Sequence, residues 1–216
     1  MSKHKINEAL PRLFVEGKDD LHVVSAICRK FQLPDTFQII DCEGVDNLLD
    51  QIPIYIKLHE PFIGILIDAD SGLEARWHQL TSILTPFNYE VSDSPDALGT
   101  IIHSDLHRSV IGVWIMPNNK VNGMLEDFAH ALIPTGDETI SYAERAIITI
   151  QESAVAKFSD IHRSKALIHT WLAWQESPGT PMGLAITKSY LDYNHDLCLL
   201  FVKWLNRLFN PSTKTE

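Results

Sequence analysis

Acidic residues stand directly after two short apolar runs in the first part of the chain. Glu16 follows residues 13–15, and Asp68 and Asp70 follow residues 62–67. If both runs are strands of one parallel sheet, their carboxyl ends meet at the edge where such sheets bind ligands. Three carboxylates brought together there would repel one another unless a cation neutralised them. Hard divalent cations favour such oxygen ligands, so the pattern predicts a site for Mg²⁺, or for Mn²⁺ in its place.

A second interpretation of these carboxylates needs no metal ion. Glu16 could cap a helix that begins after Gly17, and the two aspartates could cap a helix that begins after Gly72. Acidic side chains near helix N-termini are common and stabilise a helix by about 0.5–2 kcal/mol. The residue pattern alone leaves both interpretations open.

The segments around these carboxylates alternate between strand-like and helix-like patterns. Apolar runs predict strands at 13–15, 37–40, 62–67 and 110–116, with weaker candidates at 89–91 and 100–103. Amphipathic spacing predicts helices at 18–31, 45–58 and 73–84. Pro53 lies inside the second of these helices, where we expect a kink or a break. Alternation with short connections predicts an α/β fold, with a mainly parallel sheet flanked by helices.

The chain after Gly123 has a wholly helical pattern. Helices are predicted at 124–133, 141–158, 164–175, 182–188 and 196–209. We therefore expect an α/β core over residues 1–120 and a helical extension over residues 121–216. Because no linker-like segment separates them, the extension should pack on the core as one structural unit.

The charge of the chain is unfavourable for binding nucleic acid through a broad basic face. The formal net charge is −10, from 28 acidic and 18 basic residues. Neutralisation of phosphates supplies most of the affinity of such faces. Carboxylates that surround a cation also add to the negative count, and the bound cation reverses the local field. The charge therefore weakens the case for a nucleic-acid partner and leaves the metal hypothesis untouched.

Cysteine usage and hydropathy restrict the class of protein further. Three dispersed cysteines, Cys28, Cys42 and Cys198, form no CxxC pair and predict neither a disulfide framework nor a zinc ribbon. No window approaches the ~20 apolar residues that span a bilayer. Residues 1–13 lack the apolar core of a signal peptide. We therefore expect a cytoplasmic protein with no membrane partner, whose oligomeric state the sequence does not reveal.

The residues at the two strand ends resemble the pattern of a known family. Val15-Glu16-Gly17, followed later by Asp68-Ala69-Asp70, resembles the Toprim domain of topoisomerases, DnaG-type primases and the overcoming-lysogenization-defect (OLD) nucleases. Segments 114–119, 123–128 and 174–183 resemble a group of small stand-alone bacterial Toprim proteins of unknown function. The resemblance covers most of the chain. The resemblance implies a Toprim-like (Rossmann-like) sheet.

The resemblance also implies roles for individual residues. In the Toprim family the Glu and the two aspartates coordinate Mg²⁺ for phosphoester chemistry, and the Glu can act as a general acid or base. OLD-like nucleases add further acidic groups that hold a second ion. Two cations about 4 Å apart clamp the attacking and leaving oxygens of a phosphodiester. The implied catalytic and metal-binding residues are Glu16, Asp68 and Asp70, with Asp20, Glu126 and Asp127 as candidates for the second ion.

One position departs from the pattern of this group, and two lysines remain ambiguous. Asn118 stands where an Asp is expected, and its amide brings no charge to a second ion. Asn118 and Asn119 could instead shape a turn. Lys18 and Lys120 lie just past strand ends, where they could bind a phosphate oxygen or simply be solvated.

The acidic residues and the resemblance together predict a Mg²⁺-dependent Toprim enzyme that acts on nucleic-acid phosphodiester bonds. The resemblance alone implies an OLD-like nuclease in a phage-defence setting. A topoisomerase is not expected, because the chain leaves no room for a separate domain carrying a nucleophilic tyrosine. A primase would need a template-binding module such as a zinc ribbon. The alternatives are a non-catalytic sensor of metal and nucleotide, or a subunit whose partner, such as an ATPase, supplies the nucleic-acid surface.

Overall fold

The computed structural model describes residues 10–70, 72–104 and 106–211, and its centre is a five-stranded sheet. The strand order is β2 (Gln38–Asp41), β1 (Arg12–Val15), β3 (Phe62–Asp68), β5 (Val110–Met116) and β4 (Thr100–Ile102). The first four strands of this order are parallel, and β4 pairs with β5 in the antiparallel direction. The predicted α/β class, with its mainly parallel sheet, is therefore confirmed.

The two longest strands form the centre of the sheet. β3 and β5 pair over seven residues, from Phe62 opposite Val110 to Asp68 opposite Met116. Nearly all of their side chains are buried, on both faces of the sheet. Continuous apolar runs of this kind suit strands that are covered on both sides by helices.

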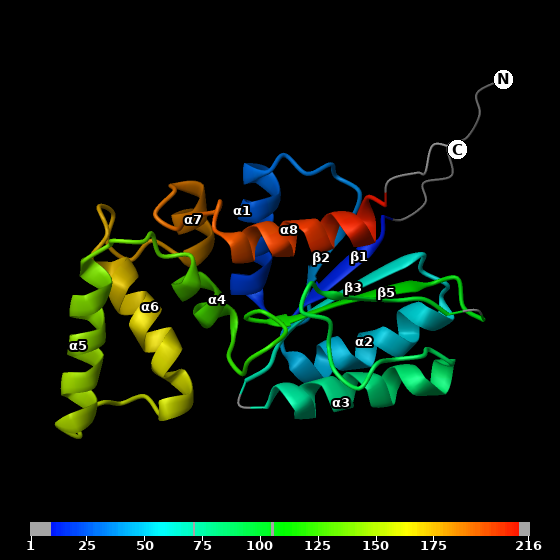
Figure 1. Ribbon diagram of the computed structural model, residues 1–216, viewed down its shortest axis with the longest axis horizontal. Coiled ribbons are helices and arrows are strands. Elements are labelled where there is room, and N and C mark those ends of the chain that lie inside the picture. Colours follow the sequence, from blue (N-terminus) through cyan, green and yellow to red (C-terminus); the bar gives the residue numbers. More distant parts are fainter. Residues whose placement is uncertain (1–9, 71, 105, 212–216) are drawn as a thin grey trace.

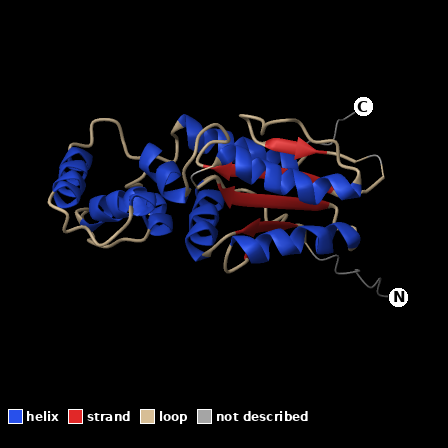
Figure 2. Cartoon of the chain, turned by 90° about the horizontal axis from the view of Figure 1, so that it is seen from below, coloured by secondary structure: helices blue, strands red, loops and turns tan. Residues whose placement is uncertain are grey.

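Helices cover both faces of the sheet (Figure 1). α2 (Val45–Lys57) and α3 (Leu73–Leu84) lie on one face, and α1 (Lys18–Lys30) and α8 (Asp196–Phe209) lie on the other. Figure 2 shows α2 and α3 in front of the strands when the molecule is seen from below. Two hydrophobic clusters result, one on each side of the sheet.

The remaining helices lie beyond the carboxyl ends of the parallel strands. They are α4 (Leu125–Ala131), α5 (Thr139–Glu152), α6 (Arg163–Ala173) and α7 (Met182–Thr187). The arrowheads of the parallel strands point toward this helical portion in Figure 2. Side chains of α4 and α6 therefore lie close to the edge where a parallel sheet binds ligands.

One hydrophobic cluster joins the sheet to the helical portion. It contains Leu13 and Trp114 from the strands, Phe128 and Trp171 from α4 and α6, and Leu205 from α8. The last helix thus returns to pack on the sheet, although it follows the helical extension in the sequence. The division of the chain at residue 120 stays a prediction.

Local differences from the sequence-based elements have physical reasons. Residues 89–91 were expected to form a strand, which is wrong: Tyr89 is held instead by the hydrogen bond of its hydroxyl to the carbonyl of Ser109, 2.9 Å away. α2 runs through Pro53 as one helix, held to the sheet by the buried Ile52 and Ile56 on either side. The helix expected to reach residue 158 ends at Glu152. Ala154, two residues later, adopts a left-handed backbone conformation with φ of +54°, which cannot continue the helix.

In the three described stretches of the chain, no helix combines the length and the apolar composition needed to cross a membrane.

Candidate metal centre

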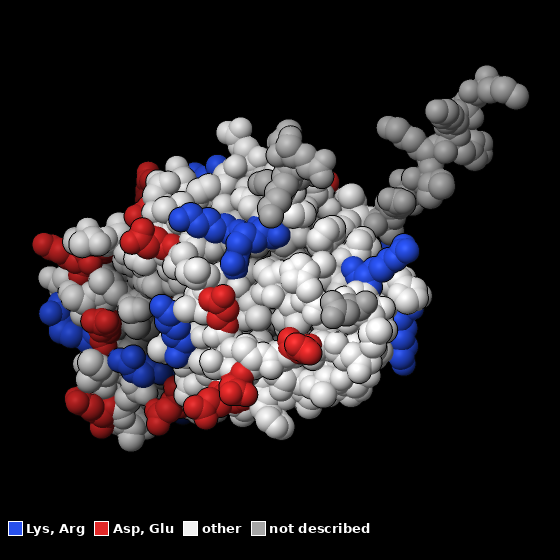
Figure 3. All heavy atoms as spheres, turned by 45° about the vertical axis from the view of Figure 1, so that its right-hand side comes forward, with Lys and Arg blue, Asp and Glu red and all other residues white. Residues whose placement is uncertain are grey.

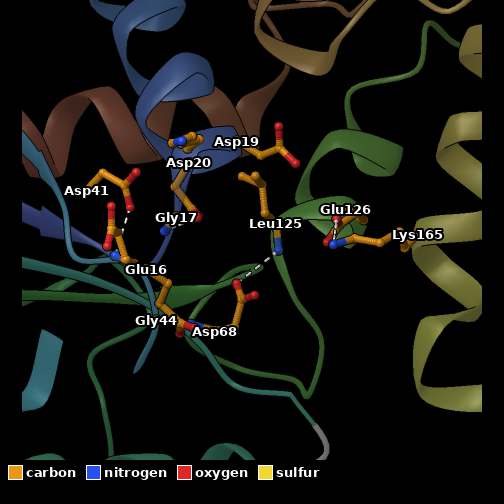
Figure 4. Close-up of a pocket in the computed structure, with 12 residues that line it drawn as sticks. Glu16, Gly17, Asp19, Asp20, Asp41, Gly44, Asp68, Leu125, Glu126 and Lys165 are labelled. Carbon is orange, nitrogen blue, oxygen red and sulfur yellow. Dashed lines mark hydrogen bonds and ion pairs between the residues drawn. The ribbon is translucent and has the colours of Figure 1, made fainter. Parts of the chain in front are cut away.

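A cavity of about 530 Å³ opens at the carboxyl ends of β1, β2 and β3 (Figure 4). Its walls come from the turns after these strands, from the first turns of α1 and α4, and from α6. The lining residues are Glu16, Gly17, Lys18, Asp19, Asp20, Asp41, Glu43, Gly44, Asp68, Leu125, Glu126 and Lys165. Seven of them are acidic and two are lysines, so the cavity concentrates negative charge.

Glu16 ties the end of β1 to the end of β3. Its Oε1 accepts a hydrogen bond of 2.7 Å from the backbone N–H of Asp68, and Oε2 takes no part in this hydrogen bond. Burial is the largest cause that raises the pKa of Glu16, although the hydrogen bond from Asp68 and the charge of Arg76 oppose it. The suggestion that Glu16 caps the following helix is wrong, because its carboxylate lies across the sheet edge.

Asp68 lies at the end of β3 and faces the cavity. Its Oδ1 accepts a hydrogen bond of 3.0 Å from the backbone N–H of Leu125, the first residue of α4. Burial raises the pKa of Asp68 to about 9, and the neighbouring carboxylates of Asp20, Glu16 and Glu126 add to the increase. The single hydrogen bond from Leu125 does not replace the hydration that this carboxylate loses on burial, so ionising it without a nearby cation is costly.

Asp20 serves both the first turn of α1 and the cavity. Its Oδ2 accepts a hydrogen bond of 3.1 Å from the backbone N–H of Gly17 and so caps the helix. The residue is 8% exposed. Burial raises its pKa to about 7, and the charge of Glu16 contributes further. Capping and cavity lining are therefore compatible in one side chain.

Glu126 and Lys165 form an ion pair at the side of the cavity formed by α4 and α6. Lys165 Nζ lies 3.0 Å from Glu126 Oε1, and the Glu126 side chain is 4% exposed while that of Lys165 is 50% exposed. Burial alone would lower the pKa of Lys165, but the hydrogen bond and charge of Glu126 raise it overall. Sequence reasoning missed Lys165, because nothing in the local pattern of α6 relates it to strands about a hundred residues earlier.

Asp70 does not line this cavity. Its Oδ2 accepts a hydrogen bond of 2.8 Å from Nη2 of Arg76, on α3. The carboxylates of Glu16, Asp68 and Asp20 thus share the cavity, while Asp70 lines two neighbouring hollows of about 410 and 390 Å³. Arg76, the partner of Asp70, was also missed by sequence reasoning.

Asp127 is engaged at the N-terminus of α4 and does not line the acidic cavity. Its Oδ2 accepts a hydrogen bond of 2.8 Å from the backbone N–H of Met124, and its Oδ1 accepts one of 2.5 Å from the hydroxyl of Ser164. The side chain therefore caps α4 and links it to α6, which leaves Glu126 as the acidic residue of α4 that reaches the cavity.

The segment after β5 behaves as a turn. Asn118 Oδ1 accepts hydrogen bonds from the backbone N–H groups of Lys120 and Val121, at 3.1 and 3.2 Å. The buried Asn119 accepts one of 2.7 Å from the N–H of Ile115. Both asparagines thus shape the turn, as the second sequence-based interpretation held. Lys18 lines the cavity, and Lys120 does not.

The chemistry of the lining suits a hard divalent cation. All the candidate ligands offer carboxylate oxygens, and a cation beside them would favour their ionised form. Among the residues with described positions, no group of three acidic, histidine or cysteine side chains is arranged to hold an ion by itself. Mg²⁺, however, keeps several waters and commonly takes only one or two carboxylates from the protein. The residues present therefore fit such an ion.

Comparison with known protein families gives a match over nearly the whole chain. A family described as "Protein of unknown function (DUF3226)" matches residues 11–210, nearly the whole chain. No curated protein and no solved structure matches significantly.

Proposed function

We propose that the chain, which belongs to the DUF3226 family, is a Mg²⁺-dependent enzyme that cleaves phosphodiester bonds in nucleic acids. The observation that carries this proposal is the meeting of Glu16, Asp20, Asp68 and Glu126 in one cavity at the carboxyl edge of a parallel sheet. The resemblance of Val15-Glu16-Gly17 and Asp68-Ala69-Asp70 to the Toprim pattern supports it. An OLD-like setting with an ATPase partner rests on that resemblance and stays a prediction.

The cost of ionising the buried carboxylates supports a cation as the partner of this site. Without a cation, Asp68 would be largely protonated at neutral pH, because its pKa is raised to about 9. Asp20 would be partly protonated, because its pKa is raised to about 7. A bound divalent cation would supply Lewis-acid polarisation of a phosphoester oxygen and of a water. The chain's own residues then orient the reactants and move the proton.

The hydrogen bonds around the cavity suggest how the residues divide this work. Glu16 is held in place through Oε1, so its other oxygen can accept a proton from an attacking water. Lys18 and Lys165 are the basic residues of the lining, and each could bind a phosphate oxygen. α4 and α6 wall one side of the cavity through Leu125, Glu126 and Lys165.

A non-catalytic function is the second candidate, and the charge of the surface favours it. On the face shown in Figure 3, acidic and basic side chains are interspersed, and no continuous basic surface crosses it. Together with the net charge of −10, this arrangement suits a small nucleotide better than a long duplex. Titration calorimetry with Mg²⁺ and a panel of nucleotides separates the two functions, because a sensor binds a nucleotide without turning it over.

The nuclease proposal is tested with labelled DNA and RNA in the presence of Mg²⁺ or Mn²⁺. Glu16→Gln and Asp68→Asn should each lower the cleavage rate about 100-fold or more, because they remove a proton acceptor or a ligand. Chelation with EDTA should abolish cleavage.

The matched control is Glu152→Gln, which changes an exposed carboxylate at the end of α5, outside the cavity lining. It should cleave at the wild-type rate. Cleavage that survives in Glu16→Gln and Asp68→Asn, or that persists in EDTA, would contradict the assignment.

A further inference from the structure

Arg76 makes three hydrogen bonds around the end of β3. Its Nε donates to the backbone carbonyl of Asp68, its Nη2 to Oδ2 of Asp70 and its Nη1 to Oε1 of Gln79, each at 2.8 Å. The Arg76 side chain is 12% exposed, so the guanidinium is largely shielded from solvent. A planar guanidinium with several donors can hold a carbonyl and a carboxylate at once, which the single ammonium of a lysine does less well.

The backbone of Asp70 is also held, in an unusual conformation. Its N–H and C=O exchange hydrogen bonds of 2.9 and 2.8 Å with Gly123, in the loop before α4. Its φ is +51°, in the left-handed region that a residue with a side chain seldom adopts. With the backbone held there and the carboxylate bound by Arg76, Asp70 lies outside the lining of the cavity that contains Asp68.

Asp70 is nevertheless close enough to affect the acidic cavity. Asp70 follows Asp68 by two residues, and Arg76 joins the Asp70 carboxylate to the backbone carbonyl of Asp68. The Asp70 side chain is 41% exposed and is therefore not locked in by packing. The ion pair with Arg76 is the side-chain attachment that would have to be released before this carboxylate could turn toward a cation.

We propose that Arg76 sets the ligands of the acidic cavity by holding Asp70 outside it. This inference rests on the proposed cation site and adds a positioning residue to it. In the resting protein the cation would then be held by Glu16, Asp68 and the other acidic residues of the lining. Asp70 would not contact the cation while Arg76 binds its carboxylate. Loss of the guanidinium frees Asp70 to add its carboxylate to the site.

The test is Mn²⁺ titration calorimetry, with no substrate present, on the full chain and a double-mutant cycle. Arg76→Gln should tighten Mn²⁺ binding about tenfold, the order of effect that groups around a metal site have on its affinity. Asp70→Asn alone should change the affinity less than about threefold. In the variant that carries both Arg76→Gln and Asp70→Asn, the tighter Mn²⁺ binding should disappear, because the carboxylate that Arg76→Gln would free is absent.

Two further variants separate this role from a merely structural one. Arg76→Lys keeps a cation beside Asp70 but cannot hold the Asp68 carbonyl and the Asp70 carboxylate together as well, so it should tighten Mn²⁺ binding less than Arg76→Gln does. Asp68→Asn should weaken binding about tenfold or more, as expected for a direct ligand. If Arg76→Gln does not fold, the contrast between Asp70→Asn and Asp68→Asn still decides whether Asp70 is a resting ligand.

The outcomes distinguish this inference from the proposed function. A wild-type chain that binds no Mn²⁺ defeats the proposed cation site and the inference with it. If the wild-type chain binds Mn²⁺, the proposed cation site stands. The inference about Arg76 then fails on its own under either of two results. One is an Asp70→Asn variant that loses affinity as strongly as Asp68→Asn. The other is an Arg76→Gln variant whose affinity is unchanged or weaker.

Discussion

Three carboxylates of the acidic cavity, those of Asp68, Glu16 and Asp20, accept hydrogen bonds from backbone N–H groups, whereas Glu126 is paired with Lys165. Asp68 accepts from Leu125 and Glu16 accepts from Asp68, while Asp20 accepts from Gly17. One such hydrogen bond does not offset the loss of hydration on burial, so the pKa of each of these carboxylates is raised. At this scale the site is a set of buried carboxyl groups that favour the protonated form in the absence of a cation.

The raised pKa values predict a pH dependence of stability. The pKa of Asp68 rises from 3.8 to about 9 on folding and that of Asp20 to about 7, so the native state holds more protons than the unfolded state between about pH 4 and pH 9. The free energy of unfolding without metal should therefore fall as pH rises through this window. Chemical denaturation at pH 5, 7 and 9 measures it.

Asp68→Asn is the control for this pH dependence, because it removes the group with the pKa of about 9. Its stability should fall less between pH 5 and pH 9 than that of the wild type. Added Mn²⁺ should stabilise the wild type more at pH 8 than at pH 5, since the cation must displace protons at low pH. An identical pH profile in wild type and Asp68→Asn would contradict the assignment of the raised pKa.

Among the elements, α8 depends on glycines in the central strands for its close approach to the sheet. A Cβ at Gly112 of β5 would lie 2.3 Å from Leu208 Cδ2, and one at Gly64 of β3 would lie 2.8 Å from Phe209 Cζ. Leu208 is fully buried and has little room to move. The absence of side chains at these two positions therefore lets the last helix cover the sheet.

This packing predicts the effect of filling the space. Gly112→Ala should destabilise the protein by about 1–3 kcal/mol, the usual cost of overpacking a core. In a Leu208→Ala background the same change should cost clearly less, because the clashing atoms are gone. Urea denaturation of the four proteins in this cycle measures the coupling. Equal costs of Gly112→Ala in both backgrounds would show that α8 does not restrict the strand.

Across the whole molecule, the sheet and the helical portion share one hydrophobic cluster. Leu13, Leu66 and Trp114 of the strands lie in the same cluster as residues of α4, α6 and α8. The cavity depends on this arrangement, because β1, β3, α4 and α6 all contribute to its walls. Folding of the helical portion onto the sheet is therefore required to complete the site.

A fragment of residues 1–120 tests this dependence, together with the predicted division of the chain. Without α8 the fragment exposes the part of the sheet that α8 covers, including Trp114, so it should lack fixed tertiary packing. Near-UV circular dichroism and dye binding by exposed apolar surface should show this, whereas the full chain should melt in one cooperative transition. A fragment with native-like near-UV signal and a cooperative melt would identify residues 1–120 as an independent domain.

Apart from the strand expected at residues 89–91, sequence alone determined the order of strands and helices along the chain, because this order follows from local hydrophobic periodicity. It also placed Glu16 and Asp68 at strand ends. Only the tertiary structure decided which carboxylates share a cavity. Asp70 lies two residues beyond Asp68, yet its left-handed φ of +51° and its bond to Arg76 turn it to another side. Lys165 reaches Glu126 only because α6 packs on α4. Side-chain direction at a turn and contacts between distant helices depend on long-range packing, which no local pattern records.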